Sequence, residues 1–302
     1  MPENKDPSSI NNNPSHSLKF NLPVTALTFL WGLNFTATKA AFWGMEMYSF
    51  LWLRSLLSAV FLFALMASWK STLSVPKQSL DFWLNTALIG LLYFFVYNGI
   101  FRTTAGRAAL FYYTQPITLT VLAFFFLPDE KASSRVILGI AAAIFGLVFV
   151  LSEKLFSGNT PTWRGDVWVF LAATTWAVQA LHLKMRLPKT NPFLLTAWSQ
   201  LVTVPPFLVI SLWLGESAPD FGRWEVFAGF IYNGLVGTGL ALVLYMKLIA
   251  LYSATRVSAF MFLTPVFGVF IGVLLLSEPI SLLMVAGVGL VAVGIYMVNT
   301  KC

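Results

Sequence analysis

The chain has 302 residues and a formal net charge of +7, and 58% of its residues are hydrophobic while only 10% are charged. Since roughly a quarter of the residues of a soluble domain are charged, this composition excludes an ordinary soluble protein and indicates one embedded in lipid. The single cysteine, Cys302, excludes an internal disulfide, and the presence of only two histidines argues against a metal centre.

The N-terminal segment 1–20 is polar and rich in Asn, Ser and Pro. It lacks the basic-then-apolar order of a secretory signal, so we expect a disordered cytoplasmic tail. One crossing of the hydrocarbon core needs about 20 apolar residues, and on that measure the sequence predicts about ten transmembrane helices. They run over 22–41, 48–68, 82–101, 105–127, 135–152, 165–185, 192–214, 225–250, 255–277 and 281–299.

The short connections between these spans predict the orientation. With the N-terminus inside, eleven Lys and Arg residues fall on the inner side of the membrane and five on the outer side. Cations gather on the cytoplasmic side of membrane proteins, so we expect both termini in the cytoplasm of a bacterium and the spans in its inner (plasma) membrane. The same bias explains the net charge of +7. Nucleic-acid binding is not expected as its cause, because recognition of a nucleic acid needs a concentrated basic face.

The second half of the chain repeats the pattern of the first. In each half an arginine precedes a proline by nine residues, and a glutamate precedes two glycines by nine and sixteen: Arg107, Pro116, Glu130, Gly139 and Gly146, then Arg256, Pro265, Glu278, Gly287 and Gly294. We therefore predict a first five-helix repeat at 21–152, a linker at 153–164 and a second repeat at 165–302. Because five is odd, the second repeat enters the membrane inverted, which places the substrate site between the halves near the midplane.

These residues resemble the EamA family of the drug/metabolite transporter superfamily. The likeness rests on Trp31-Gly32-Leu33-Asn34-Phe35, Arg54, Ala105-Gly106-Arg107-Ala108-Ala109, Gln115-Pro116 and Asp129-Glu130, and later on Arg256-Val257-Ser258-Ala259, Thr264-Pro265 and Ser277-Glu278-Pro279. Asp129-Glu130 departs from the family's usual Gly-Glu, at a loop. The resemblance implies an all-α integral membrane protein with two inverted five-helix repeats around a central cavity. It also implies export or exchange of small metabolites, often amino acids or their relatives.

Arg54 is the one charge placed well inside a predicted span. Two interpretations stay open: a clamp that binds a substrate carboxylate through two parallel hydrogen bonds, and a structural arginine that binds helix-end carbonyls or snorkels outward. The acids lie in tails, loops or the outermost turns of spans. Their placement argues against a proton pump built on a central carboxylate and against a two-carboxylate hydrolase. The sequence has no Walker motif, so we expect neither ATP as energy source nor a cofactor.

Polar and aromatic residues at membrane depth are the candidates for substrate contacts. Asn34 and Gln179 hold equivalent positions in the two repeats, and each lies one turn from a tryptophan, Trp31 or Trp176, on the same helix face. Hydrogen bonding between helices is the rival interpretation for the amides. The predicted substrate-binding set is Trp31, Asn34, Arg54, Tyr97, Tyr113, Gln115, Trp176, Gln179, Trp198, Asn233 and Tyr245.

Two further features have a functional and a structural interpretation. Pro116 and Pro265 lie near the middle of equivalent spans, where each removes a backbone N–H. They predict either a matched pair of hinges or simple packing kinks. His182 lies near the inner end of its span, where we expect an interfacial side chain, with a proton-linked role as the rival.

The sequence therefore predicts a secondary transporter rather than an enzyme. We expect alternating access to a small metabolite, in first place an amino acid or a related amphipathic compound. The alternatives are a transporter of nucleobase or nucleotide-like metabolites, which would stack on the aromatic rings, a membrane-embedded enzyme acting on a lipid precursor, and a structural or assembly protein. The expected partners are the small-molecule substrate and membrane lipids, and a monomer is one option for the oligomeric state.

Overall fold

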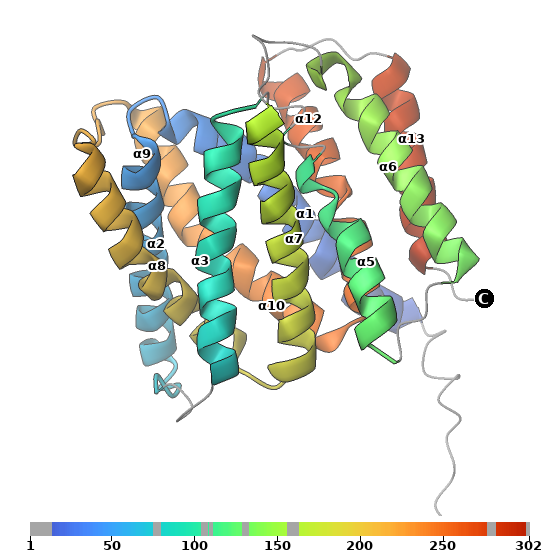
Figure 1. Cartoon of the computed structure of the whole chain (residues 1–302), viewed down its shortest axis with the longest axis horizontal. Coiled ribbons are helices and arrows are strands. Elements are labelled where there is room, and N and C mark those ends of the chain that lie inside the picture. Colours follow the sequence, from blue (N-terminus) through green and yellow to red (C-terminus); the bar gives the residue numbers. More distant parts are fainter. Residues whose placement is uncertain are drawn as a thin grey trace, which may run out of the picture.

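The protein is a bundle of helices, and no strand occurs among the residues that the computed structural model describes, which are 14–74, 80–103, 108, 111–128, 133–155, 163–276 and 282–299. Figure 1 shows the helices standing side by side along one common direction. In lipid, each backbone N–H and C=O must be paired within its own segment, which a helix achieves. The predicted all-α membrane fold is confirmed.

The first half of the chain supplies α1 (Pro14–Ala41), α2 (Met47–Ser68), α3 (Leu80–Ile100), α5 (Gln115–Phe126) and α6 (Ser134–Leu155). The second half supplies α7 (Trp163–Arg186), α8 (Pro192–Leu214), α9 (Trp224–Ile231), the π-helical segment η2 (Tyr232–Leu240), α10 (Ala241–Leu251), α11 (Ala254–Phe260), α12 (Leu263–Leu276) and α13 (Leu282–Asn299). Within the described ranges, six helical stretches are long and apolar enough to cross a membrane by themselves: α2, α3, α6, α8, α13 and the continuous rod 224–251 formed by α9, η2 and α10.

The start of α1 corrects the expected tail. The helix begins at Pro14, so its first turns take in the end of the segment 1–20 that we expected to be disordered. Proline is well placed there, because the first helical position needs no N–H donor. Residues 1–13 lie outside the described residues, as do the repeat cues Arg107, Glu130 and Glu278.

Two of the predicted spans are broken. Span 255–277 divides into α11 and α12 with a turn at Met261 and Phe262, and the described part of span 105–127 has a turn just before α5. Pro116 and Pro265 each lie in the first turn of the helix that follows the break. Because proline has no N–H to donate to the carbonyl one turn earlier, each proline explains the break that precedes it.

The glycines that recur at matching positions bring α6 and α13 into close contact. A Cβ added at Gly146 would lie 2.6 Å from the carbonyl oxygen of Gly287, and one added at Gly287 would lie 2.6 Å from the carbonyl oxygen of Gly146. Gly139 and Gly294 face each other in the same reciprocal way. These glycines therefore permit the close approach of the two helices, which Figure 1 shows side by side.

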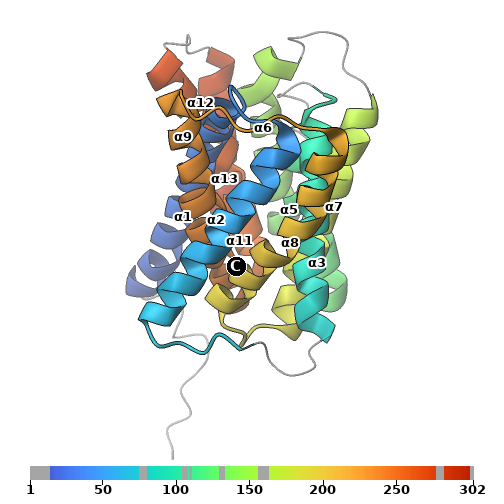
Figure 2. The ribbon, with the colours of Figure 1, turned by 90° about the vertical axis from the view of Figure 1, so that its left-hand side faces the viewer.

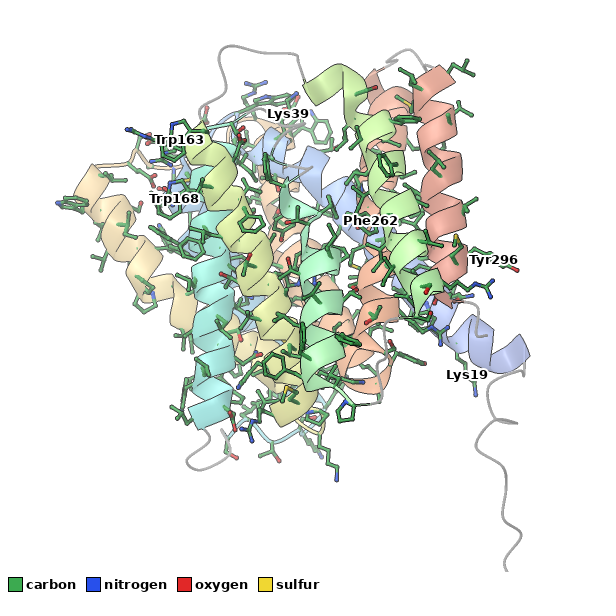
Figure 3. The ribbon with its side chains drawn as sticks, turned by 45° about the vertical axis from the view of Figure 1, so that its right-hand side comes forward. Lys19, Lys39, Trp163, Trp168, Phe262 and Tyr296 are labelled. Carbon is green, nitrogen blue, oxygen red and sulfur yellow. The ribbon has the colours of Figure 1, made fainter. Side chains whose placement is uncertain are left out.

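The outer surface of the bundle is apolar, with tryptophans at its ends. We call the end that holds Lys39 and Trp163 in Figure 3 the upper end, and the end that holds Lys19 the lower end. Trp163 and Trp224 are exposed near the upper end, and Trp69 is exposed where α2 finishes at the lower end. Tryptophan favours the membrane–water interface, so these side chains mark the two boundaries of the lipid-facing surface.

Local sequence signals fix the ends of α8, which Figure 2 shows beside α2. The Asn191 side chain accepts a hydrogen bond from the backbone N–H of Phe193 at 2.9 Å, and proline occupies the first turn. At the other end Gly215 adopts φ +66°, a left-handed conformation that only glycine takes at little cost. The sharp stop points the following residue, Glu216, toward the start of α2.

Candidate functional site

Four aromatic side chains from both halves of the chain meet in the bundle. The ring centroid of Trp31 on α1 lies 5.6 Å from that of Trp176 on α7 and 5.3 Å from that of Tyr245 on α10. Trp176 and Tyr245 are 5.5 Å apart, and Tyr112 stacks on Trp176 at 5.0 Å with an angle of 26° between the rings. We call these four residues the central aromatic cluster. The structure therefore brings the two predicted tryptophans together, as their equivalent positions suggested.

The π-helical segment η2 holds one side of the cluster. The indole Nε1–H of Trp31 donates to the carbonyl oxygen of Gly237 at 3.0 Å. Asn34, one turn further along α1, lies so close to Gly237 that a Cβ there would overlap its side chain, and the Oδ1 atom of Asn34 is buried without a hydrogen-bond partner. A π-helical stretch inside a long helix is rare and is frequent at functional sites.

Arg54 lies inside the bundle and is 2% exposed, so it does not snorkel. Its Nη1 donates to the hydroxyl of Thr238, in η2, at 2.8 Å. The guanidinium carbon lies 4.5 Å from the ring centre of Tyr93, 4.9 Å from that of Tyr97 and 5.3 Å from that of Phe50. Nε and Nη2, the two donors on one edge of the guanidinium, are buried without partners.

The predicted amides divide into free and satisfied groups. Both polar atoms of the Gln115 side chain are buried without a partner. Gln179 donates from Nε2 to Oδ1 of Asn85 at 3.0 Å, which leaves its Oε1 unpartnered. Asn233 is fully bonded: its Oδ1 accepts from the Thr38 hydroxyl at 3.0 Å, and its Nδ2 donates to a backbone carbonyl. This arrangement gives Asn233 the interhelical role that was its rival interpretation.

Of two further predicted residues, Trp198 packs outside the central aromatic cluster, whereas Tyr113 borders it, with its ring centroid 5.8 Å from that of Tyr112. The Trp198 ring packs edge-on against Phe63 at 5.6 Å and Trp83 at 5.7 Å, and Trp83 is 40% exposed. Tyr113 lies at the turn before α5 and faces Phe262, at the turn before α12, with ring centroids 6.5 Å apart. The two helix breaks therefore face each other, as equivalent positions in two inverted repeats would.

The sequence analysis left four residues near the site out of the predicted set. Tyr93 stands one turn before Tyr97 on α3, and that spacing could have marked it. Tyr112 is half of a Tyr-Tyr pair, and Gln200, whose Nε2 donates to the Tyr93 hydroxyl at 3.2 Å, is a deep amide. Nothing in the sequence marked Thr238, because its role depends on the geometry of η2.

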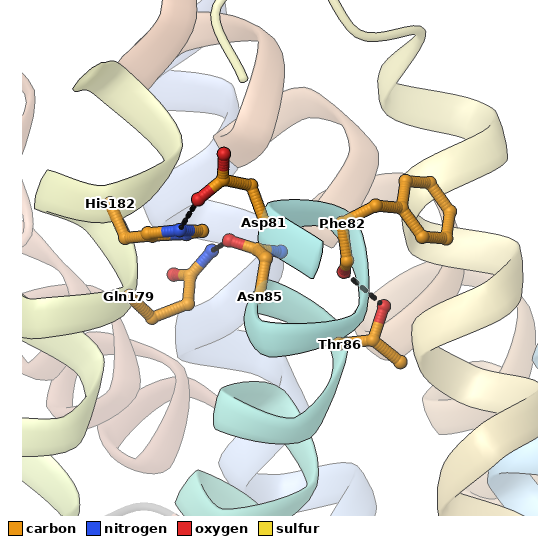
Figure 4. Close-up of polar contacts among 6 residues, drawn as sticks. All are labelled: Asp81, Phe82, Asn85, Thr86, Gln179 and His182. Carbon is orange, nitrogen blue, oxygen red and sulfur yellow. Dashed lines mark hydrogen bonds and ion pairs between the residues drawn. The ribbon is translucent and has the colours of Figure 1, made fainter. Parts of the chain in front are cut away.

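A second group of polar side chains joins α3 and α7 at the lower end. Figure 4 shows its two hydrogen bonds: His182 Nε2 with Asp81 Oδ1 at 3.0 Å, and Gln179 Nε2 with Asn85 Oδ1, also at 3.0 Å. The side chain of Asp81 is 45% exposed, whereas that of His182 is 13% exposed. We call these four residues the polar ladder.

Carboxylates tie the connections together at the upper end. Glu216, in the connection between α8 and α9, accepts hydrogen bonds from the backbone N–H groups of Tyr48 at 3.0 Å and Ser49 at 2.6 Å. Its carboxylate therefore caps the N-terminus of α2. Glu46 in turn accepts from the backbone and hydroxyl of Ser217 at 2.9 and 2.6 Å. These hydrogen bonds hold the pKa of the Glu46 carboxyl below its ordinary value.

Two surface hollows lie at the lower end, beside the connection between α7 and α8. One has a volume of about 460 Å³ and is lined by residues 185–191 and Leu194. The other, of about 370 Å³, reaches Leu183 on α7 and Met246 on α10, the neighbour of Tyr245.

The chain is similar to known transporters along nearly its whole length. The EamA-like transporter family model matches residues 21–152 and 163–300. An uncharacterized transporter of Bacillus subtilis, YoaV, is 26% identical over 284 residues, which cover 93% of this chain and 96% of that protein. A probable amino-acid metabolite efflux pump of Escherichia coli is 30% identical over 280 residues, covering 89% of this chain and 90% of that protein.

The fold is also similar to one in a solved structure. A protein crystal structure superimposes with a TM-score of 0.82 at 15% sequence identity, and the match covers 93% of this chain and 98% of the other. At that identity the likeness shows the fold alone.

Proposed function

Because this chain belongs to the EamA-like transporter family, we propose that it is a secondary transporter that exports or exchanges amino acids or related amphipathic carboxylates. The observation that carries the proposal is the free edge of Arg54, where Nε and Nη2 are buried without partners. The E. coli relative named as a probable amino-acid metabolite efflux pump supports the same substrate class.

The buried guanidinium needs an anion. A charged side chain at membrane depth is costly and usually pairs with a partner or borders a water-filled path. Thr238 takes up one donor of Arg54, and the faces of Tyr93 and Tyr97 provide cation–π attraction of about 0.5–2 kcal/mol each. The edge formed by Nε and Nη2 matches the two oxygens of a carboxylate, which it would bind through two parallel hydrogen bonds.

The surroundings of Arg54 suit a substrate with one anionic group and an apolar body. The rings beside the guanidinium offer apolar contacts, while Gln200, which donates to the Tyr93 hydroxyl, supplies an unpartnered Oε1. Small-molecule sites have this character. The stacked rings of Tyr112 and Trp176 would also suit a nucleobase, but a nucleotide phosphate would require several deep cations.

The proposed cycle alternates access between the two ends of the bundle. The lower end, where α1 begins, would face the cytoplasm, and the two halves would rock about the site near the midplane. The breaks before Pro116 and Pro265 face each other through Tyr113 and Phe262, and this contact supports the proposal that the two prolines are the hinges of this motion.

The test is exchange of labelled amino acids and simple carboxylates by purified protein in proteoliposomes without ATP. Wild-type exchange should be saturable. Arg54→Lys keeps the charge but loses the two-donor edge, so its apparent affinity should fall at least about tenfold, the effect of losing 1.4 kcal/mol. Thr238→Ser, which keeps the hydroxyl, is the matched control. If no carboxylate is exchanged, or if Arg54→Lys binds as well as the control, the proposed substrate site is wrong.

A further inference from the structure

The polar ladder contains a titratable contact that the proposed substrate site does not use. Histidine is the side chain that ordinarily changes charge between pH 5 and 8, and His182 is in contact with a carboxylate at 3.0 Å. His182 also shares a face of α7 with residues of the proposed site. Trp176, Gln179 and His182 recur at intervals of three along this helix. Trp176 belongs to the central aromatic cluster.

The two nitrogens of the imidazole face different surroundings. Nε2 faces Asp81, whose side chain is 45% exposed to the water at the lower end. Nδ1 is buried and has no hydrogen-bond partner. Gln179 lies three residues before His182 on the same face of α7, and its Oε1 is an acceptor that is also buried without a partner (Figure 4). One helical turn of α7 therefore carries both an unpartnered acceptor and a nitrogen that can acquire a proton.

We propose that His182 is the binding site for a proton that is carried in exchange with the substrate, an inference that rests on the transport function proposed above. One proton from water binds Nδ1 of the neutral imidazole and converts it into an imidazolium ion. Nε2–H continues to donate to Asp81, whose carboxylate balances the new charge. Release returns the same proton to water, and no other reactant takes part.

Protonation changes the connection between α3 and α7. In the neutral ladder two hydrogen bonds cross from one helix to the other, and Oε1 of Gln179 has no partner. The new Nδ1–H can donate to this oxygen while Gln179 keeps its bond to Asn85. All four side chains then form one connected chain between the helices. The protonated site therefore holds α3 and α7 together at the lower end, and loss of the proton loosens that contact.

Among the described residues, the other charged side chains on α7 and on the helices packed against it have their own partners or are exposed. Of the elements packed against α7, α5 carries no titratable residue, and α3 contributes Asp81. Lys247 on α10 is exposed, and Arg256 on α11 donates to α13. On α7 itself Lys184 donates to a backbone carbonyl at 2.6 Å and Arg186 is exposed. The carboxylate of Asp81 is therefore the contact that governs the charge of the imidazole.

The first test compares two modes of transport in proteoliposomes. Substrate exchange at equal pH needs no net proton movement, whereas accumulation driven by an imposed pH gradient does. His182→Gln should keep exchange within about twofold of wild type and lose at least tenfold of the gradient-driven accumulation. The control is Asp166→Asn, which removes a carboxylate at the upper end of the same helix, where Thr103 donates to it at 2.6 Å. The control should keep both modes.

The outcomes separate this inference from the proposed function. If wild type exchanges substrate but ignores the pH gradient, or if His182→Gln accumulates substrate as wild type does, the proton site is refuted while the transporter stands. Failure of all exchange would refute the transport proposal itself and, with it, the coupled proton.

A second measurement does not depend on transport. The chain has two histidines, so a His16→Gln variant with ¹⁵N-labelled histidine gives the NMR signal of His182 alone. The signal should show the Nε2–H form at high pH and the imidazolium form, protonated on both nitrogens, after acidification. An imidazole that stays neutral on acidification would overturn the inference.

Discussion

The close approach of α6 and α13 gives the sharpest test of the packing. A methyl group added at Gly287 would meet the carbonyl oxygen of Gly146 at 2.6 Å and the backbone nitrogen of Val150 at 2.7 Å. Both are backbone atoms, so no side chain can rotate away. An ordinary contact begins at 3.4 Å, and the difference between 3.4 and 2.6 Å means that the helices must separate by roughly 0.8 Å. Overpacking of this kind costs about 1–3 kcal/mol.

The same helix offers a matched control for Gly287→Ala. Gly289 lies two residues away, and a methyl group added there would meet nothing within 4 Å. Alanine improves helix propensity by up to about 1 kcal/mol at either position, so this gain cancels when the two variants are compared. We therefore expect Gly287→Ala to be less stable than Gly289→Ala by about 1–3 kcal/mol.

The free energy of unfolding can be measured by titrating SDS into mixed micelles and following helix content by circular dichroism. Gly146→Ala should behave like Gly287→Ala, because the contact is reciprocal. If Gly287→Ala unfolds at the same SDS fraction as Gly289→Ala, the close approach of α6 and α13 does not exist and the reasoning fails.

Two other predictions concern the segments around the site and the upper end. Gly237→Ala would overlap the Asn34 side chain, so we expect exchange to fall at least about tenfold, the kinetic equivalent of 1.4 kcal/mol; normal exchange would show that Asn34 moves freely. Because the pKa of folded Glu46 lies below its ordinary 4.5, its contribution to stability is present above pH 4.5 and is lost as the pH falls through the lower folded value. Wild type should therefore lose its thermal-stability advantage over Glu46→Gln on acidification below 4.5, and a pH-independent difference would contradict the role of this carboxylate.

The amino-acid sequence predicted much of the fold because lipid restricts what a backbone can do. Apolar stretches long enough to cross the bilayer must be helices, and the structure is helical at the places where they occur. The glycines of the repeated spacing, Gly139, Gly146, Gly287 and Gly294, lie at a helix contact, since small residues are what allow two helices to approach closely in a membrane.

The site was only partly predictable, and the tryptophans show why. Trp31, Trp176 and Trp198 all lie within apolar spans, yet the first two meet in the central aromatic cluster while Trp198 packs with Phe63 and Trp83. In a membrane protein the lipid-facing and the buried sides of a helix are both apolar, so periodicity does not mark which side faces the partner helices.

The sequence by itself therefore determined which stretches form apolar helices and how the repeat is spaced. Both depend on the hydrophobicity and size of neighbouring residues. The tertiary structure alone decided that Thr238 faces Arg54 and that Glu216 caps α2, since these pairs are 184 and 167 or more residues apart. Such contacts depend on the rotation of one helix against another, and the energy that fixes this rotation comes from packing across the whole bundle rather than from any one segment.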